Sequence, residues 1–485
     1  MQTSVSPRIG NCLTLILLAV SAQAQNPVPT PKVTGPIPVT ATSHIFGGIK
    51  DTLAPIDLAK AGYVEEEYII SGMANVYDWN ADGSLAVKGA NNPYATRILV
   101  RRPAQAARFS GTVVVEIPNI ARRFDWPMIW GFSHDYWMEH GDAWVQIGMP
   151  ASVASMKKFD PARYGSLTFD NTTKVCPGET EDGLRYDMFS QVAAAIKSKA
   201  AGMPFANLNV QRAFLTTQDT GMVTYINAFH QQARLEGGKP TYDGYLIKVL
   251  NAPGAINSCA RPVAATDPRR MLKAVDVPTI TVIAQGEVEG MAWSRQPDSD
   301  AAVGKHRRFE LAMASHIDKW AYTGLASFAD QNKLGAAQGT PDWPFNARCE
   351  PEIVLQDEPL LSYGFNMAFA HLDKWVRDGV APPRVDRMQL DAAGKLVVNE
   401  YGIGNGGIRS PYSDLPIAKY TNASGGPGNC REFGSTTPLP WSQLEKLYGT
   451  HASYVQKVNA SIDRMVKERW INEADAKRMR AELTK

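Results

Sequence analysis

The sequence is poor in the features that mark several common classes of protein. It has only 5 cysteines among 485 residues, and none shows the CxxC or CxxH spacing of a zinc site. Its 50 basic and 48 acidic residues give a net charge of +2 without a basic block, which argues against nucleic-acid binding. The apolar run at residues 13–20 is too short to span a bilayer, and no other stretch reads as a span. We therefore expect no metal site, no nucleic-acid partner and no membrane span.

The N-terminus does have the pattern of a signal peptide. Arg8 precedes the apolar run, and the small residues of "AQA" at 22–24 follow it, which predicts cleavage after Ala24. We predict that residues 1–24 are removed and that the mature protein is secreted or periplasmic. An even number of cysteines in an oxidising compartment predicts two disulfides, with three possible pairings. The four cysteines left are Cys176, Cys259, Cys349 and Cys430.

Predicted strands alternate with predicted helices along the middle of the chain. Apolar, β-branched runs predict strands at 111–119, 142–150, 212–217, 277–287 and 306–316. Helical periodicity and end signals predict helices at 186–200, 221–234, 362–379 and 454–470. This alternation indicates an α/β fold with a mainly parallel sheet flanked by helices. We expect a core at 105–380, an extended, β-rich region at 25–104 and a C-terminal cap or supporting segment at 381–485.

The turn at residues 216–221 contains no serine, although a turn between a strand and a helix carries a serine nucleophile in many hydrolases. In "FLTTQDTGMVTYINAFH" (214–230) a strand runs into a helix through a sharp turn, which in many hydrolases carries the nucleophile. Two later predicted strands lead to Glu287 and His316, and functional groups collect at the carboxyl ends of parallel strands. A histidine there can take a proton from a nucleophile while a carboxylate fixes its tautomer. The sequence therefore predicts a site made of this turn, Glu287 and His316.

Ordered blocks along nearly the whole mature chain resemble the large, usually secreted α/β-hydrolase domain proteins of bacteria and fungi. These blocks include "VVVEIPN", "DPARYGSL", "YDMFSQ", "TYINAFH", "FELAMASHID" and "GIGNGGIRSPYSDLP". The resemblance implies an α/β-hydrolase fold and ester chemistry. It gives the role of catalytic histidine to His316 and the role of acid to Glu287, with Glu289 as the alternative acid. Arg163 and Tyr164, in "DPARYGSL", are expected to line a pocket.

The nucleophile of that family does not transfer to a single position. The family pattern resembles "GYSQTG" ahead of a helix that ends in "TYINA". Alignment backwards from this helix places Thr216 at the serine, one deletion places Thr217 there, and alignment forwards from the strand places Asp219 there. An elbow residue often has positive φ, which a β-branched threonine adopts poorly, so sterics favour Asp219. Thr217 would preserve acyl chemistry, whereas Asp219 would resemble the nucleophile of haloalkane dehalogenases.

The leading prediction is an exported hydrolase that acts on an ester or lactone of a small to medium-sized organic molecule. His316 would be the general base and Glu287 its orienting acid. Backbone N–H groups would stabilise the oxyanion, namely those of Asn119, Ile120 and Thr220. One alternative is an Asp219-nucleophile enzyme that cleaves a carbon–halogen or epoxide bond, and another is a ligand-binding protein without catalysis. A small-molecule substrate is the expected partner, no cofactor is implied, and the sequence indicates no particular oligomeric state.

Two further motifs are given structural interpretations. "HDYWMEH" (134–140) contains potential metal ligands without the HExxH spacing, so we predict a surface helix. "GIGNGG" (402–407) matches G-x-G-x-x-G, but the proline in the following "IRSPYSD" disfavours the helix that dinucleotide binding requires. We predict a loop near the site at 402–407.

Overall fold

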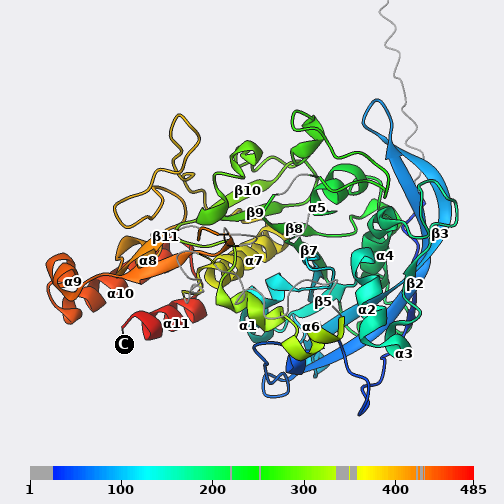
Figure 1. Cartoon of the computed structure of the whole chain (residues 1–485), viewed down its shortest axis with the longest axis horizontal. Helices are drawn as coiled ribbons and strands as arrows, with labels where there is room; N and C mark the ends of the chain where they lie inside the picture. Colours follow the sequence, from blue (N-terminus) through cyan, green and yellow to red (C-terminus); the bar gives the residue numbers. More distant parts are fainter. Residues whose placement is uncertain are drawn as a thin grey trace, which may run out of the picture.

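Figure 1 shows the computed structural model of the chain. The structure describes residues 26–218, 221–250, 253–334, 349, 358–421, 424–426, 430 and 432–484. The predicted signal peptide at 1–24 lies outside these residues.

A ten-stranded sheet runs through the centre of the molecule. Its order is β1-β2-β3-β5-β4-β7-β8-β9-β10, and β6 pairs with β3. In this order, the six strands β5, β4, β7, β8, β9 and β10 are parallel to one another, whereas β1, β2 and β3 form an antiparallel edge. The strands are β1 (Lys32–Thr34), β2 (Tyr63–Trp79), β3 (Leu85–Pro103), β4 (Thr112–Ile117), β5 (Ala143–Ile147), β6 (Thr168–Phe169), β7 (Arg212–Thr217), β8 (Gly244–Lys248), β9 (Thr279–Ala284) and β10 (His306–Leu311).

Each face of the parallel sheet is covered by a separate hydrophobic core. Helices α1 (Met128–His140) and α7 (Leu360–Asp378) pack together on one face, and α4 (Arg185–Lys197) packs on the other with α5 (Gly221–Thr224). Successive strand residues alternate between the cores: Val114 belongs to the first, whereas Val113 and Val115 belong to the second. Because both faces are buried, these strands read as continuous apolar runs in the sequence.

The predicted α/β fold is confirmed, with local differences. The helix predicted at 362–379 ends, as expected, at Gly379, which has a φ of +69°. The helix predicted at 221–234 is shorter, because α5 passes into a π-helical turn at Tyr225–Phe229. The remaining helices are α2 (Val153–Phe159), α3 (Pro161–Tyr164), α6 (Phe328–Leu334), α8 (Pro411–Asp414), α9 (Trp441–Tyr448), α10 (His451–Lys467) and α11 (Glu473–Leu483).

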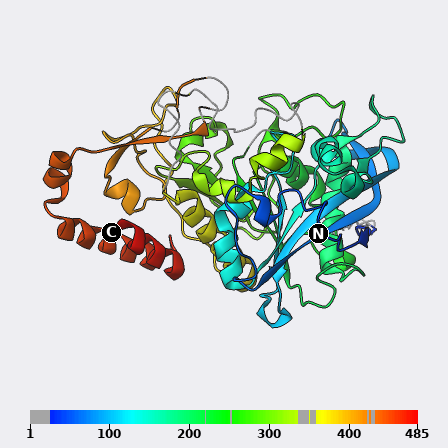
Figure 2. The ribbon, with the colours of Figure 1, turned by 60° about the horizontal axis from the view of Figure 1, so that its bottom comes forward.

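The two ends of the described chain lie on opposite sides of the molecule. The long hairpin of β2 and β3 is at the right of Figure 1, and the C-terminal helices α9, α10 and α11 are at the left (Figures 1 and 2). Strands β2 and β3 fall in the region predicted as 25–104, yet they belong to the same sheet as the core strands. A small core around Val458 and Ile462 joins α10 and α11 to Tyr363 of α7, and β11 (Ala418–Thr421) pairs with β12 (Ser435–Pro438) nearby in the chain. The division into three regions stays a prediction.

A buried ion cluster ties the antiparallel edge to the core. We call it the Glu67 cluster and define it as Glu67, Arg97, Asp125, Arg163 and Tyr164. Glu67 accepts from Arg97 Nη1 (2.9 Å), Arg163 Nε (2.6 Å) and the Tyr164 hydroxyl (2.9 Å), while Arg97 Nε donates to Asp125 Oδ2 (3.3 Å). The charged side chains are at most 1% exposed. Arg163 and Tyr164, which were expected to line a pocket, both donate to Glu67 in the interior.

The cysteines pair as Cys176–Cys259 and Cys349–Cys430, which selects one of the three pairings that the sequence left open. Two disulfides were predicted, and both pairs are at bonding distance. Among the helices of the described residues, none combines the length and apolar character that crossing a bilayer requires.

Candidate functional site

The predicted site residues gather at the carboxyl ends of the parallel strands. The chain leaves β4 for β5 on one side, whereas β7 lies on the other side of β4, so the strand order switches direction at this point. Ligand sites of open α/β sheets lie at such switch points. Polar residues follow five neighbouring strands here: Asn119 after β4, Gln218 after β7, Lys248 at the end of β8, Glu287 after β9 and His316 after β10.

His316 and Glu287 form a hydrogen-bonded pair, although 29 residues separate them. His316 Nδ1 lies 2.6 Å from Glu287 Oε1, and Glu287 Oε2 accepts from the Ala284 N–H at 2.8 Å. A carboxylate can only accept, so His316 carries a proton on Nδ1, and in the neutral ring Nε2 has a free lone pair. The Glu287 side chain is 4% exposed, whereas that of His316 is 22% exposed. This geometry is that of a general base oriented by a buried acid.

Lys248 joins this pair, and the sequence reasoning missed it. Its Nζ lies 2.5 Å from Glu287 Oε1, the same oxygen that faces His316, and its side chain is fully buried. Burial by itself would raise the pKa of Glu287, but the Lys248 ammonium and the His316 ring lower it below its ordinary value. The carboxylate is therefore ionised at neutral pH. The signal in the sequence was a charged residue at the end of the apolar strand "GYLIK".

Gln218 is the residue that faces the other nitrogen of His316. The Nε2 atoms of the two side chains are 3.2 Å apart, so the amide N–H donates to the ring lone pair. Gln218 is 5% exposed, and its Oε1 has no hydrogen-bond partner among the described residues. We call His316, Glu287, Lys248 and Gln218 the His316 cluster. The sequence reasoning used Gln218 only to fix an alignment and did not predict this contact.

The threonines that were candidates for the nucleophile lie inside the strand. Thr216 and Thr217 are the last residues of β7, both fully buried. The Thr217 hydroxyl donates to the Ile117 carbonyl at 3.0 Å, and the Thr216 hydroxyl has no hydrogen-bond partner among the described residues. Among the described residues, neither hydroxyl binds His316, because both threonines lie within β7 rather than in the turn that follows it. Asp219 and Thr220 lie outside the described residues.

The two backbone N–H groups expected after β4 as oxyanion donors, those of Asn119 and Ile120, differ in whether they are already hydrogen-bonded within the protein. The Asn119 N–H donates to the Trp126 carbonyl at 2.9 Å, so this donor is occupied in the structure. The expectation that it is available to an oxyanion is contradicted, because Asn119 and Trp126 form a short antiparallel bridge. No described residue accepts from the Ile120 N–H. Of the two donors expected after β4, the Ile120 N–H stays a candidate.

Glu289, the alternative acid, faces away from His316. Its carboxylate accepts from the Lys395 ammonium at 3.0 Å and from the Leu396 N–H at 2.9 Å.

Two other acids lie near the His316 cluster. Burial raises the pKa of Asp318 to about 7 and also raises that of Glu432. Among the three described acids near His316, namely Glu287, Asp318 and Glu432, the pKa is lowered only for Glu287.

Comparison with known proteins assigns the chain to a family. The sequence matches the family model "Alpha/beta hydrolase domain" over residues 33–481. The chain belongs to this α/β hydrolase domain family. No curated protein matches its sequence significantly.

Among solved structures, this α/β hydrolase is similar to several esterases. A thermostable esterase from Pseudomonas putida is 14% identical, with 58% of this chain and 82% of that chain covered and a TM-score of 0.30. Esterase Est22 is 12% identical, with 47% and 66% covered and a TM-score of 0.26. A cold-adapted esterase from an Arctic intertidal metagenomic library is 10% identical, with 51% and 83% covered and a TM-score of 0.25. Because these identities and TM-scores are low, the assignment of the chain to its family rests on the family-model match alone.

The two remaining motifs of the chain have structural roles. "HDYWMEH" is the end of α1, which was expected on the surface but is mostly buried, because α1 packs against the sheet, α7 and the 3₁₀ turn at Lys319–Gly324. Its His134 Nδ1 binds the Trp130 carbonyl at 3.1 Å, and the described residues contain no group of three metal-ligating side chains. "GIGNGG" forms a loop, as predicted. Gln285, two residues before Glu287, holds this loop through the Gly402 carbonyl and the Gly404 N–H, both at 2.9 Å.

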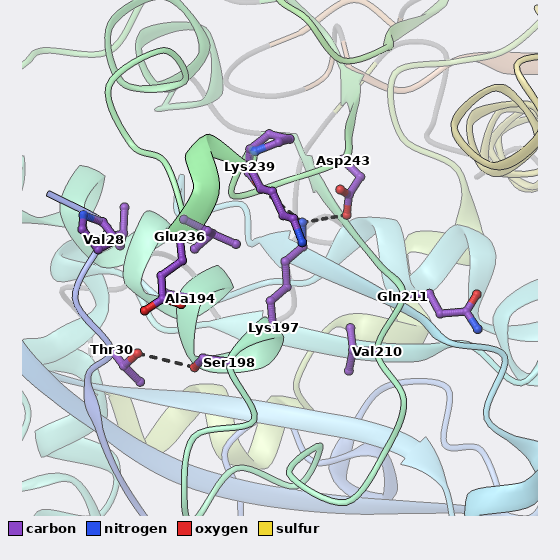
Figure 3. Close-up of a pocket in the computed structure, with 13 residues that line it drawn as sticks. Val28, Thr30, Ala194, Lys197, Ser198, Val210, Gln211, Glu236, Lys239 and Asp243 are labelled. Atoms are coloured by element: carbon purple, nitrogen blue, oxygen red, sulfur yellow. Dashed lines mark hydrogen bonds and ion pairs between the residues drawn. The ribbon is translucent and has the colours of Figure 1, made fainter. Parts of the chain in front are cut away.

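A hollow of about 440 Å³ lies at the opposite end of the sheet from the His316 cluster (Figure 3). Residues that precede β7 and β8 line it, together with α4 and the N-terminal residues around Val28. Its Lys197 ammonium is held by Asp243 at 2.8 Å and by the Pro240 carbonyl at 3.2 Å. Of the charged side chains drawn there, Lys197 and Asp243 pair with each other, and the residues that line the hollow include no histidine.

Proposed function

We propose that this α/β hydrolase cleaves an ester or lactone of a small to medium-sized organic molecule, with His316 as the general base. The observation that carries the proposal is the 2.6 Å hydrogen bond between His316 Nδ1 and the ionised Glu287, which leaves Nε2 as a proton acceptor. The partial exposure of the His316 ring supports it, because a base must reach its substrate.

The attacking group in this proposal is a water molecule. The side chain beside His316 Nε2 is the amide of Gln218, which has no nucleophilic oxygen of hydroxyl type. When the amide moves aside, water can take its place, and Nε2 accepts a proton as the water oxygen bonds to the substrate carbonyl carbon. The carbonyl oxygen becomes an oxyanion, to which the Ile120 N–H is a candidate donor. The intermediate then expels the alcohol oxygen, which takes the proton from the imidazolium, and the products are a carboxylic acid and an alcohol.

The test is hydrolysis of p-nitrophenyl acetate, p-nitrophenyl butyrate and a five-membered lactone by the wild type and by His316→Ala. We expect turnover by the wild type without an initial burst of p-nitrophenol, and loss of turnover in the variant. Equal rates for the two proteins, or no turnover of any substrate by the wild type, would contradict the proposal.

A single turnover in heavy-oxygen water identifies the nucleophile. Direct attack by water puts the heavy oxygen into the acid product of the first turnover. If Asp219 attacks, the first product receives an unlabelled oxygen from the protein and the label appears on Asp219 instead. If Thr217 attacks, a phosphonate inhibitor modifies that residue. The Asp219 outcome would favour the predicted alternative that cleaves carbon–halogen or epoxide bonds.

One observation favours a second candidate, a ligand-binding protein without catalysis. Gln218 fills the hydrogen-bonding position of His316 Nε2 with a donor, which holds the base in an occupied state. A ligand that binds near His316 without being turned over, seen as protection of the ring in a titration, would support this candidate.

We also infer that the protein is exported after loss of residues 1–24. The two cysteine pairs at bonding distance support an oxidising compartment. N-terminal sequencing of the mature protein from its native host should begin at Gln25. An intact Met1 in the mature protein would contradict the inference.

A further inference from the structure

Lys248 is a buried charge for which the proposed hydrolysis has no use. A general base needs a carboxylate to orient it, and Glu287 already does so. A lysine is almost never fully buried unless it is paired, and Lys248 is paired with Glu287 at 2.5 Å. The ammonium and the His316 ring share one oxygen, Oε1, while Oε2 faces the backbone of Ala284.

The shared oxygen fixes the direction of the carboxylate. Three donors approach Glu287 from three elements: Lys248 from β8, His316 from the loop after β10, and the Ala284 N–H from its own turn. With Oε2 bound to the backbone and Oε1 bound to the ammonium, rotation away from His316 would break two hydrogen bonds. Lys248 thus holds the acid in the orientation that the imidazole needs.

The ammonium also offsets the charge of the acid. A lone carboxylate favours the charged imidazolium, whereas a cation on the same oxygen opposes it. Among the described residues, three other titratable groups interact with the cluster: Asp318, which interacts with Lys248; Glu432, which interacts with His316, Lys248 and Arg122; and Tyr420, which burial keeps neutral. Asp318 and Glu432 are both pushed toward their neutral forms by burial, so Lys248 and Glu287 are the dominant opposing charges next to the ring.

We propose that Lys248 is a positioning residue of the His316 cluster, which aims Glu287 at His316 and opposes protonation of the imidazole. This inference rests on the proposed role of His316 as a base. It adds that the lysine sets the lower pH limit of that base.

The test measures the titration of His316 by NMR in the full-length protein labelled with nitrogen-15 at histidine. His316→Asn identifies the resonance among those of the 8 histidines. Lys248→Met removes the charge and the donor, while Lys248→Gln removes the charge and keeps a donor. In both variants we expect the ring to titrate about one pH unit higher than in the wild type, a tenfold change in its proton affinity. Lys248→Arg, which keeps the charge, should titrate as the wild type does.

Lys395→Met is the matched control, because Lys395 pairs with the neighbouring acid Glu289 and is exposed. It should leave the titration of His316 unchanged. An unchanged titration in both Lys248→Met and Lys248→Gln would overturn the proposal, as would an equal shift in the control. Failure of both charge-removing variants to fold would also overturn it, because the lysine would then serve stability rather than the base.

The NMR titration needs no turnover, so it separates this inference from the proposed function. If the wild type hydrolyses no ester yet the titration shifts as expected, the lysine acts on His316 and only the proposed reaction fails. Where turnover is present, the acidic limb of the kcat/KM profile should move upward with the ring, by about the same one unit.

Discussion

The molecule buries two clusters of charged side chains that differ in whether a titratable group remains exposed to solvent. In the Glu67 cluster, both carboxylate oxygens of Glu67 are occupied by Arg97, Arg163 and Tyr164, and the charged side chains are at most 1% exposed. In the His316 cluster, Glu287 is equally well bound, but it orients a ring that is 22% exposed. Among the described residues, the other nitrogen of that ring is met by the amide of Gln218 alone.

This difference shows that buried charge does not by itself mark a functional site. Both clusters join distant segments of the chain, and both depend on a carboxylate with several donors. Each charged side chain of the Glu67 cluster has an ion-pair partner within the protein and is at most 1% exposed, so the cluster serves to stabilise the fold. The His316 cluster ends on a partly exposed ring, and in the proposed function its Nε2 takes a proton from water once Gln218 moves aside.

The largest expected effect is on stability, and it comes from the Glu67 cluster. Glu67→Ala leaves Arg97 and Arg163 buried without their shared carboxylate, so we expect the free energy of unfolding to fall by about 3–5 kcal/mol. Urea denaturation measures it. Glu66→Ala is the control, because its partly exposed pair with Arg102 (2.9 Å) should contribute below about 1 kcal/mol. If Glu67→Ala instead lowers turnover per folded molecule, the two clusters are not separate in function.

The next effect is on rate. His316→Ala should lower kcat/KM for p-nitrophenyl butyrate by about 10³-fold, the contribution of a general base, equivalent to about 4 kcal/mol. The free energy of unfolding should change by less than about 1 kcal/mol, since the ring is partly exposed. His451→Ala, an exposed histidine at the start of α10, should leave both quantities unchanged. A loss of stability as large as that of Glu67→Ala would make His316 a structural residue.

A smaller loss of rate is expected for the acid. Glu287→Gln keeps the shape of the side chain but replaces an oxygen acceptor by an N–H donor, so the His316 tautomer is no longer fixed. We expect kcat/KM to fall by about 10²-fold, equivalent to about 3 kcal/mol. Glu289→Gln is the control and should keep full activity, because Glu289 binds Lys395 and Leu396. Equal losses in the two variants would reopen the choice of acid.

The smallest effect is expected for Gln218. Its amide must leave His316 Nε2 before water can enter, so Gln218→Ala should raise kcat/KM about fivefold, the equivalent of one net hydrogen bond of about 1 kcal/mol. Gln191→Ala removes a comparable amide that binds Met73 and Tyr94 at the other side of the molecule, and it should change stability alone. If Gln218→Ala loses as much activity as His316→Ala, the amide binds the substrate instead of competing with it.

Much of the fold could be predicted from local patterns. The apolar runs of β4, β7 and β9 and the glycine at the end of α7 gave elements close to those observed, because burial on both faces and a left-handed cap leave direct traces in sequence. The position of α1 could not be predicted in this way. Its polar residues suggested a surface helix, whereas packing against α7 and the segment Lys319–Gly324 buries it.

The candidate site was predicted in part. His316 and Glu287 were expected to meet, since both follow parallel strands, and the structure brings them together. Lys248 and Gln218 were not expected in the site, because their roles depend on strand neighbours that the sequence does not display. The nucleophile alignments placed Thr216 or Thr217 in the turn, whereas pairing with β4 and β8 keeps both in the strand.

The sequence by itself determined the alternation of strands and helices, the membership of the α/β hydrolase domain family and the two acids and one histidine to consider. Only the tertiary structure decided which acid faces the histidine, which lysine shares its oxygen and which amide occupies the free nitrogen. The physical reason is that strand burial and helix caps are local properties, carried by neighbouring residues. Hydrogen bonds among side chains from four strand ends are set by strand order and direction, and these depend on the whole chain.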